Sequence, residues 1–149
     1  MGGSRAVLMV GLFLLASASA PLASSHTQQT LTVILVGDGV VSGNITDPAF
    51  VQGNALWFRM EDNTENTTMK VRLDIDQDGV FNASNDFEST DLVHECELNE
   101  TGALVDEDCA VSATYAFSMN ATVGTYAFWV HRTSNETETV WNHTVAVHK

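Results

Sequence analysis

The segment Met69–Ile75 (MKVRLDI) alternates apolar and polar side chains without a break. Successive side chains of a β-strand point to opposite faces, so its apolar residues are predicted to face a core while Lys70, Arg72 and Asp74 face the other way. No segment has helical periodicity, so the chain is predicted to be all-β, an antiparallel β-sandwich. The other predicted strands, which polar turns separate, are Thr32–Val36, Leu56–Asp62, Thr114–Met119, Tyr126–Arg132 and Val140–His148.

Residues 1–25 have the organisation of a secretory signal peptide. Arg5 precedes an unbroken apolar run, Ala6–Leu15, and small residues follow it. The run is shorter than the about 20 residues that cross a bilayer, which favours a cleaved signal over an uncleaved membrane anchor. Cleavage after Ser25 would leave His26 as the first residue. Cleavage after Ala20 also fits the small-residue pattern.

Residues 26–149 have the length of one domain, and they contain no second apolar segment that would insert into a membrane. The whole chain has a net charge of −13, with 6 basic and 19 acidic residues. Nucleic acid and anionic membranes are therefore disfavoured as partners, because phosphate binding needs clustered Lys and Arg. The charge suits calcium binding, solubility in salt or a basic partner, and charge alone does not separate these.

Cys96 and Cys109 are the two cysteines. In an exported chain an even number of cysteines predicts a disulfide, which export favours over two free thiols. The loop that this bridge closes is expected to gain about 3 kcal/mol from the reduced entropy of the unfolded chain. The bridge would pin an acidic surface excursion near residues 86–111.

N-glycosylation acceptor sites (Asn-x-Ser/Thr) are more frequent than the about two that chance would place here. Their number indicates a chain that is glycosylated on a cell surface or outside the cell, although abundant Asn and Thr in polar turns would explain some of them. The seven acceptors are Asn44, Asn66, Asn82, Asn99, Asn120, Asn135 and Asn142.

The loop that follows Leu73 has the spacing of a calcium site. Carboxylates occupy its positions 1, 3 and 5, and Gly79 at position 6 permits a sharp turn. Hard oxygen ligands at this spacing suit Ca²⁺. The predicted ligands are Asp74, Asp76, Asp78, the main-chain carbonyl of Val80, Asn82 and Asp86.

The loop differs from an EF-hand at position 12, where Asn85 replaces the bidentate Glu and Asp86 follows one place later. No helices flank it, so we interpret it as an EF-like loop on a β scaffold. Asn82 is both a candidate ligand and a glycan acceptor, and a glycan there would leave the site dependent on Asp86. The alternative is a solvated acidic turn in which Asp side chains cap main-chain N–H groups.

Three segments in order, Val71–Phe81, Thr114–Asn135 and Val140–His148, resemble the polycystic-kidney-disease (PKD) domain. That family has an Asp-x-x-Asp-Gly turn, then an aromatic strand, a Gly-Thr-Tyr turn and a Val-rich last strand. The resemblance implies an immunoglobulin-like sandwich, with Tyr126 at the tyrosine-corner position. The matching residues are Asp74, Asp78, Gly79, Tyr115, Phe117, Gly124, Thr125 and Tyr126.

The resemblance implies a non-catalytic module that contacts proteins or carbohydrates, although a fold alone does not fix a function. The motifs of hydrolases, zinc proteases and phosphate-binding loops do not occur, so enzyme activity is not predicted. His131 and His143 lie on neighbouring predicted strands and form a candidate surface patch. We favour the simpler interpretation that they are half-exposed strand residues.

The function predicted from sequence is a secreted or cell-surface interaction or adhesion module, stabilised by calcium and a disulfide. The alternative is a self-assembling filament or surface-layer subunit. In it, His26–Val36 would leave its own domain and add as a strand to the next copy. An ordinary first strand explains this segment equally well and is favoured. A third alternative, an accessory domain split from a larger hydrolase, is disfavoured by the signal peptide.

Overall fold

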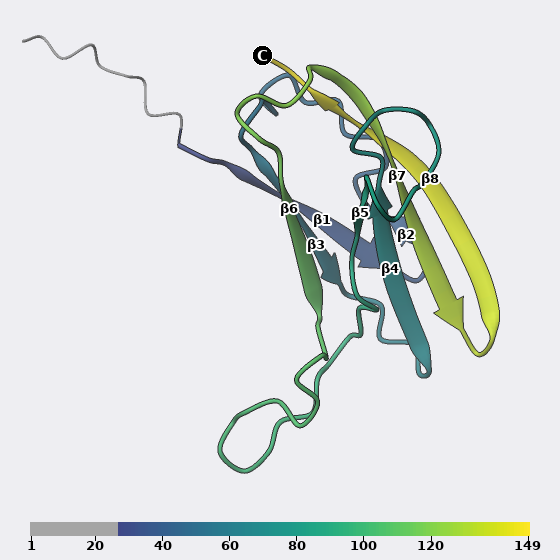
Figure 1. Cartoon of the computed structure of the whole chain (residues 1–149). Coiled ribbons are helices and arrows are strands. Elements are labelled where there is room, and N and C mark those ends of the chain that lie inside the picture. The colour runs from purple at the N-terminus through teal and green to yellow at the C-terminus, as the bar shows by residue number, and fades with distance from the viewer. Residues whose placement is uncertain (1–26) are drawn as a thin grey trace, which may run out of the picture.

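The computed structural model describes residues 27–149, which form eight β-strands (Figure 1). No helix capable of crossing a membrane is found in this part of the chain. The predicted signal peptide, residues 1–25, and His26 lie outside the described residues. The strands are β1 (Thr30–Val36), β2 (Gly39–Val40), β3 (Ala55–Met60), β4 (Thr67–Leu73), β5 (Phe87–Glu88), β6 (Ser112–Ala116), β7 (Gly124–Ser134) and β8 (Thr137–Val147).

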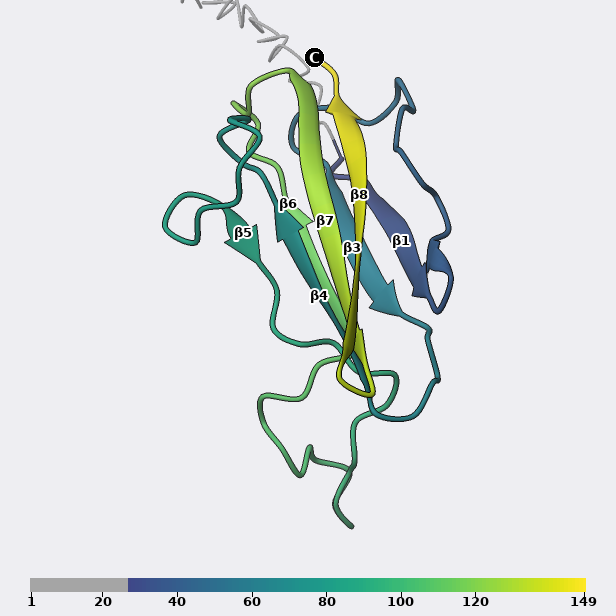
Figure 2. The same cartoon turned by 90° about the vertical axis from the view of Figure 1, so that its right-hand side faces the viewer.

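Two four-stranded sheets make the layers of a β-sandwich, as predicted (Figures 1 and 2). Sheet A has the order β2-β1-β3-β6, and sheet B has the order β5-β4-β7-β8. All strand pairs are antiparallel except β1 and β3, which are parallel. The parallel pair arises because residues 37–54 return the chain to the end of the sheet where β1 began. Bridges from Ile45 and Val51 to the last strand region hold this return segment.

All six predicted strands occur, with ends within three residues of the expected ones. β4 follows the predicted alternation, since Met69, Val71 and Leu73 are fully buried. Asp74, predicted to point away from these three residues, is also buried. Asp74 lies one residue past the end of β4, where the acidic loop begins. β2 and β5 were not predicted, because two residues carry no periodic pattern.

The core lies between the sheets and is filled from both. Phe58 on β3 and Phe128 on β7 meet edge to face, with ring centroids 5.8 Å apart. Both are fully buried, as are Leu35 on β1 and Val145 on β8. Each such side chain contributes about 1.5–3 kcal/mol by leaving water. This packing holds the two sheets face to face.

Segment Thr30–Val36 lies within its own domain, where it pairs with β3 along its length. Val33 and Leu35 are fully buried in the core. This is the arrangement of an ordinary first strand. Exchange with another copy would require both buried side chains to leave and return.

The predicted disulfide between Cys96 and Cys109 is present. The loop that it closes extends away from the sandwich below β6 (Figure 1). A bridge between Leu98 and Leu104 organises its tip, yet the Leu98 side chain remains 58% exposed. The loop between the cysteines is held by the disulfide and by its own main-chain hydrogen bonds, whereas within the range 86–111 expected to form the excursion Phe87–Glu88 forms β5 and Leu92 is fully buried.

A buried ion pair joins the two sheets. Asp62, just after β3, accepts a hydrogen bond from Arg132 Nε on β7 at 2.7 Å, and Thr64 donates to its other oxygen. Burial acts to raise the pKa of Asp62, but the hydrogen bonds and the charge of Arg132 outweigh it, so this pKa lies below its ordinary value. A lowered carboxyl pKa stabilises the fold above the pKa of the unfolded chain, and this contribution is lost as pH falls through the folded value.

We therefore expect Asp62→Asn to lower the free energy of unfolding at pH 7 by about 2 kcal/mol, the scale of hydrogen bonds to charged groups. Urea melts at pH 7 and below pH 3 measure this, and the difference from wild type should disappear at the lower pH. Glu61→Gln is the matched control, because its ion pair with Arg59 is exposed and should contribute little. Equal effects of the two substitutions would contradict the assignment.

Candidate metal centre

The end of β4 positions the acidic loop. Asp74 N–H donates to the carbonyl of Ala127 at 2.9 Å, which continues the pairing with β7 beyond Leu73. The chain then turns back, with positive φ at Gln77 (59°) and Gly79 (82°). Glycine adopts such angles without steric cost, as the sequence predicted for position 6 of the loop.

Four carboxylates converge inside this turn. One oxygen from each of Asp74, Asp76, Asp78 and Asp86 lies within 4.8 Å of the others. Two oxygens bound to one Ca²⁺ at 2.3–2.6 Å are at most about 5 Å apart, so the spacing of the four oxygens meets this necessary condition for sharing an ion. Asp74 is buried, Asp86 is half-buried, and the other two are exposed. The cluster is thus fixed at its base and open to solvent at its mouth.

Main-chain N–H groups orient the first three carboxylates. Each N–H bonds to one oxygen, which leaves the second oxygen free to point elsewhere. These bonds run from Gly79 N to Asp74 Oδ2 (2.7 Å), from Asp78 N to Asp76 Oδ1 (3.3 Å) and from Val80 N to Asp78 Oδ1 (2.9 Å). They are the capping bonds of an acidic turn, and they also pre-organise three ligands.

Asp86 closes the cluster from the far end of the loop. Its Oδ1 accepts from Ile75 N and its Oδ2 accepts from Asn82 N, both at 2.8 Å. These bonds tie the two ends of the loop together. The residue after the substituted position 12 therefore joins the cluster, as the sequence suggested, while Asn85 is exposed.

Asp74 Oδ1 is buried and has no hydrogen-bond partner; among the described residues, His148 Nε2 is the other such side-chain atom. An unpartnered buried polar atom costs about 1–3 kcal/mol, and more when it is charged. No ion pair within residues 27–149 involves any of the four aspartates. Capping bonds explain the other oxygen of Asp74 and leave this one without a partner. A cation in the cluster would satisfy it.

The closeness of the carboxylates shifts the pKa values of Asp76 and Asp78. The pKa of Asp76 is raised mainly because its protonated form would share a hydrogen bond with the neighbouring Asp74 carboxylate, and desolvation and the charge of Asp78 add to this effect. The N–H of Val80 is the main cause that lowers the pKa of Asp78. The cluster thus holds negative charge at close range without a positive side chain to balance it.

The other two predicted ligands, Asn82 and the Val80 carbonyl, are not among the four carboxylates of the cluster. The Asn82 side-chain oxygen accepts bonds from Ser84 N (3.1 Å) and Ser84 Oγ (2.8 Å), so it caps its own turn. Val80 is 65% exposed, and its N–H donates to Asp78 Oδ1. The structure brings together the four aspartates, and it engages the Asn82 side chain elsewhere.

The two histidines considered as a surface patch do not come together. His131 lies opposite Val140 and His143 lies opposite Phe128 in the β7–β8 pair. Positions 128 and 131 differ by three along β7, so the histidine side chains occupy opposite faces of sheet B. His131 instead contacts Glu138, with Nδ1 and Oε1 2.9 Å apart. Sequence proximity of the strands alone could not reveal this difference in face.

No known protein family matches the sequence, and no curated protein matches it significantly. The physical chemistry of the described residues is therefore the basis for assigning a role to this loop.

The crowding of carboxylates has a measurable consequence in ion-free protein. With EDTA at pH 7, we expect Asp76→Asn to melt at a higher temperature than wild type. The pKa of the Asp76 carboxyl is raised in the fold, so its ionised form destabilises the protein at pH 7, and the substitution removes that charge. The amide retains the oxygen that caps Asp78. Asp38→Asn, at an exposed aspartate outside the loop, is the control and should leave the melting temperature unchanged. A lower melting temperature for Asp76→Asn would refute the crowding.

Proposed function

We propose that this chain is a secreted or cell-surface, non-catalytic interaction module, stabilised by calcium, N-glycosylated and immunoglobulin-like in the manner of PKD domains. The observation that carries the proposal is the buried, unpartnered Asp74 Oδ1 within a ring of carboxylates. Hard oxygen ligands on a turn suit Ca²⁺, which is abundant outside cells. The disulfide between Cys96 and Cys109 fits the same oxidising compartment.

Calcium in this loop would act as a structural ion. Gln77 Nε2, in the same turn, donates to the carbonyl of Thr125 at the start of β7 (3.1 Å). An ion bound by Asp74 and Asp86 would fix both ends of the turn and strengthen its attachment to sheet B. Rigidity at this end of the sandwich suits a module that holds a partner rather than one that performs chemistry.

The glycan acceptors support an extracellular role, and their positions also suggest which face of the sandwich binds a partner. All seven acceptor asparagines are exposed. Asn142 lies on β8, and the others lie in loops and turns, so no strand of sheet A carries an acceptor. Glycans would therefore leave the outer face of sheet A bare.

Trp57 lies on the outer side of β3, and the Arg59 guanidinium carbon is 5.0 Å from its ring centroid. An aromatic ring paired with a cation offers both stacking and hydrogen bonding to a protein or carbohydrate partner. We assign partner binding to this face of sheet A.

The tyrosine of the proposed PKD-like corner makes the expected kind of bond. Tyr126 is buried, and its hydroxyl donates to the main-chain carbonyl of Thr122. In immunoglobulin-like domains a tyrosine at this corner bonds to main chain a few residues upstream. This contact supports the proposed resemblance independently of the acidic turn.

Calcium should raise the melting temperature of the chain. At a free concentration 100 times the dissociation constant, binding adds about 2.7 kcal/mol to the free energy of unfolding. Calorimetry in CaCl₂, MgCl₂ and EDTA measures the shift. Asp76→Asn should abolish it, and Asp38→Asn should retain it. A wild-type melting temperature that is the same in CaCl₂ and EDTA would sink the calcium proposal.

Export and glycosylation are tested by expressing the full chain in secretory cells that perform N-glycosylation. We expect protein in the medium that begins at His26 and loses mass with a glycan-removing amidase. Asn135→Gln, at the exposed β7–β8 turn, should lower the mass by one glycan. Asn63→Gln is the matched control, because Asn63 is outside an acceptor sequence. Retention in the cell, or an unmodified secreted protein, would count against this part of the proposal.

A further inference from the structure

β6 forms one edge of sheet A, where it pairs with β3. Met60 N–H donates to the carbonyl of Val111, and Phe117 N–H donates to the carbonyl of Asn54, both at 2.9 Å. In an antiparallel pair, main-chain groups of alternate residues point toward the neighbouring strand. The odd-numbered residues of β6 therefore direct their main-chain groups toward β3.

The even-numbered residues, Ser112, Thr114 and Ala116, direct their N–H and C=O groups away from β3. Among residues 27–149, no hydrogen bond outside the paired strands involves these outward groups, and the pairing with β3 uses the odd-numbered residues. A row of unpaired main-chain donors and acceptors at sheet spacing is a template for another extended strand. The outward main-chain groups of β6 are therefore open to pairing with an additional strand.

Natural edge strands are usually protected by charged side chains or proline. β6 has neither, and no Asp, Glu, Lys or Arg occurs between residues 109 and 130. This uncharged stretch stands out in a chain with a net charge of −13. The segment 26–37, which includes β1, also lacks charged residues, but it is shorter.

The opposite edge of sheet A is partly closed. β2 covers the end of β1, and Val41 N–H donates to the carbonyl of Ile34 at 3.0 Å. In sheet B, the outer edge of β8 is covered in part by Ile45, which bonds with Thr144 and Ala146. On the β6 edge, Val93 N–H donates to the carbonyl of Ala110, just before the strand, and residues 112–116 remain uncovered.

We propose that β6 is a self-association edge, on which β6 of a second copy adds in the antiparallel direction about a twofold axis at Thr114. In this register Thr114 lies opposite Thr114 of the other copy, and Ser112 lies opposite Ala116. All the outward main-chain groups then meet one another, which makes about six hydrogen bonds. The two copies of sheet A become one continuous sheet.

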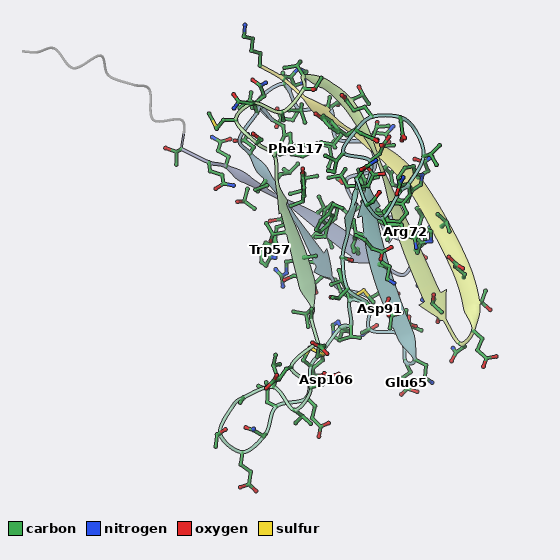
Figure 3. The ribbon with its side chains drawn as sticks, viewed as in Figure 1. Trp57, Glu65, Arg72, Asp91, Asp106 and Phe117 are labelled. Atoms are coloured by element: carbon green, nitrogen blue, oxygen red, sulfur yellow. A yellow bond between two sulfur atoms is a disulfide. The ribbon has the colours of Figure 1, made fainter. Side chains whose placement is uncertain are left out.

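The side chains fit this register. Thr opposite Thr is a favourable cross-strand pair, and no like charges face each other. Val111, on the core-facing side of the strand, is 41% exposed, and it would lie opposite Phe117 of the second copy. Figure 3 shows Phe117 on the side toward sheet B and Trp57 on the outer face. Pairing at the edge would thus cover Val111 and leave the Trp57 face open.

Net charge sets the conditions for association. Beginning at His26, each copy has 5 basic and 19 acidic residues, a net charge of 5 − 19 = −14, so two copies repel one another; at 0.15 M salt this repulsion is screened beyond about 8 Å. The edge contact itself is uncharged, so salt should weaken the repulsion without weakening the contact. We expect the dimer to be favoured as NaCl rises from 0.02 to about 0.5 M.

Sedimentation velocity of unglycosylated chain beginning at His26, from micromolar to millimolar concentration, tests the proposal. We expect a monomer–dimer equilibrium that Thr114→Pro weakens by about tenfold or more. Proline removes the N–H of Thr114, which faces outward and is not used within the monomer. Its melting temperature at low concentration should therefore stay close to that of wild type.

A second pair of variants keeps the test decisive if Thr114→Pro fails to fold. Thr114→Glu places like charges opposite each other across the axis, while Thr32→Glu adds the same charge on β1. Thr32 and Thr114 flank Trp57 in the same cross-strand row. Thr114→Glu should abolish the dimer, and Thr32→Glu should not. A wild-type monomer at every concentration and salt, or a dimer sensitive only to Thr32→Glu, would overturn the proposal.

Discussion

The pairing of β4 with β7 is the interaction on which most of this structure depends. It runs from Thr67 opposite Ser134 to Leu73 opposite Phe128, along the middle of sheet B. On its inner side it presents the side chains that meet sheet A, including Phe128 against Phe58. One step past its end, Asp74 still bonds to Ala127. The same ladder therefore supports the core and delivers the first carboxylate of the acidic loop.

Much of the fold follows from residue patterns because strands with one buried face have a period of two. Met69, Val71 and Leu73 are placed correctly by that period alone. The parallel pairing of β1 with β3 is not contained in any local pattern, since it depends on the path of residues 37–54. β2 and β5 form because longer neighbours supply their partners, so their own residues carry no signal.

The sequence predicted which four aspartates come together in the candidate site, but it did not predict the burial of Asp74. Spacing of carboxylates around Gly79 identified Asp74, Asp76 and Asp78, and the departure at Asn85 pointed to Asp86. Burial of Asp74 was not predicted, because alternation gives the face on which a side chain lies and not what covers that face. That burial converts an ordinary acidic turn into one with an unsatisfied oxygen. It arises from tertiary packing, which spacing does not encode.

The two sheets differ in what they offer to other molecules. Sheet B carries an acceptor asparagine on β8 and holds the acidic turn at the end of β4, so its surroundings are polar and suited to ions and glycans. Sheet A has no acceptor on its strands, and β6 ends it with uncharged residues. The repulsion between strongly acidic surfaces falls off over about a Debye length, so contact is easiest where charge is absent. The distribution of charge is thus the ground on which we propose that association uses sheet A.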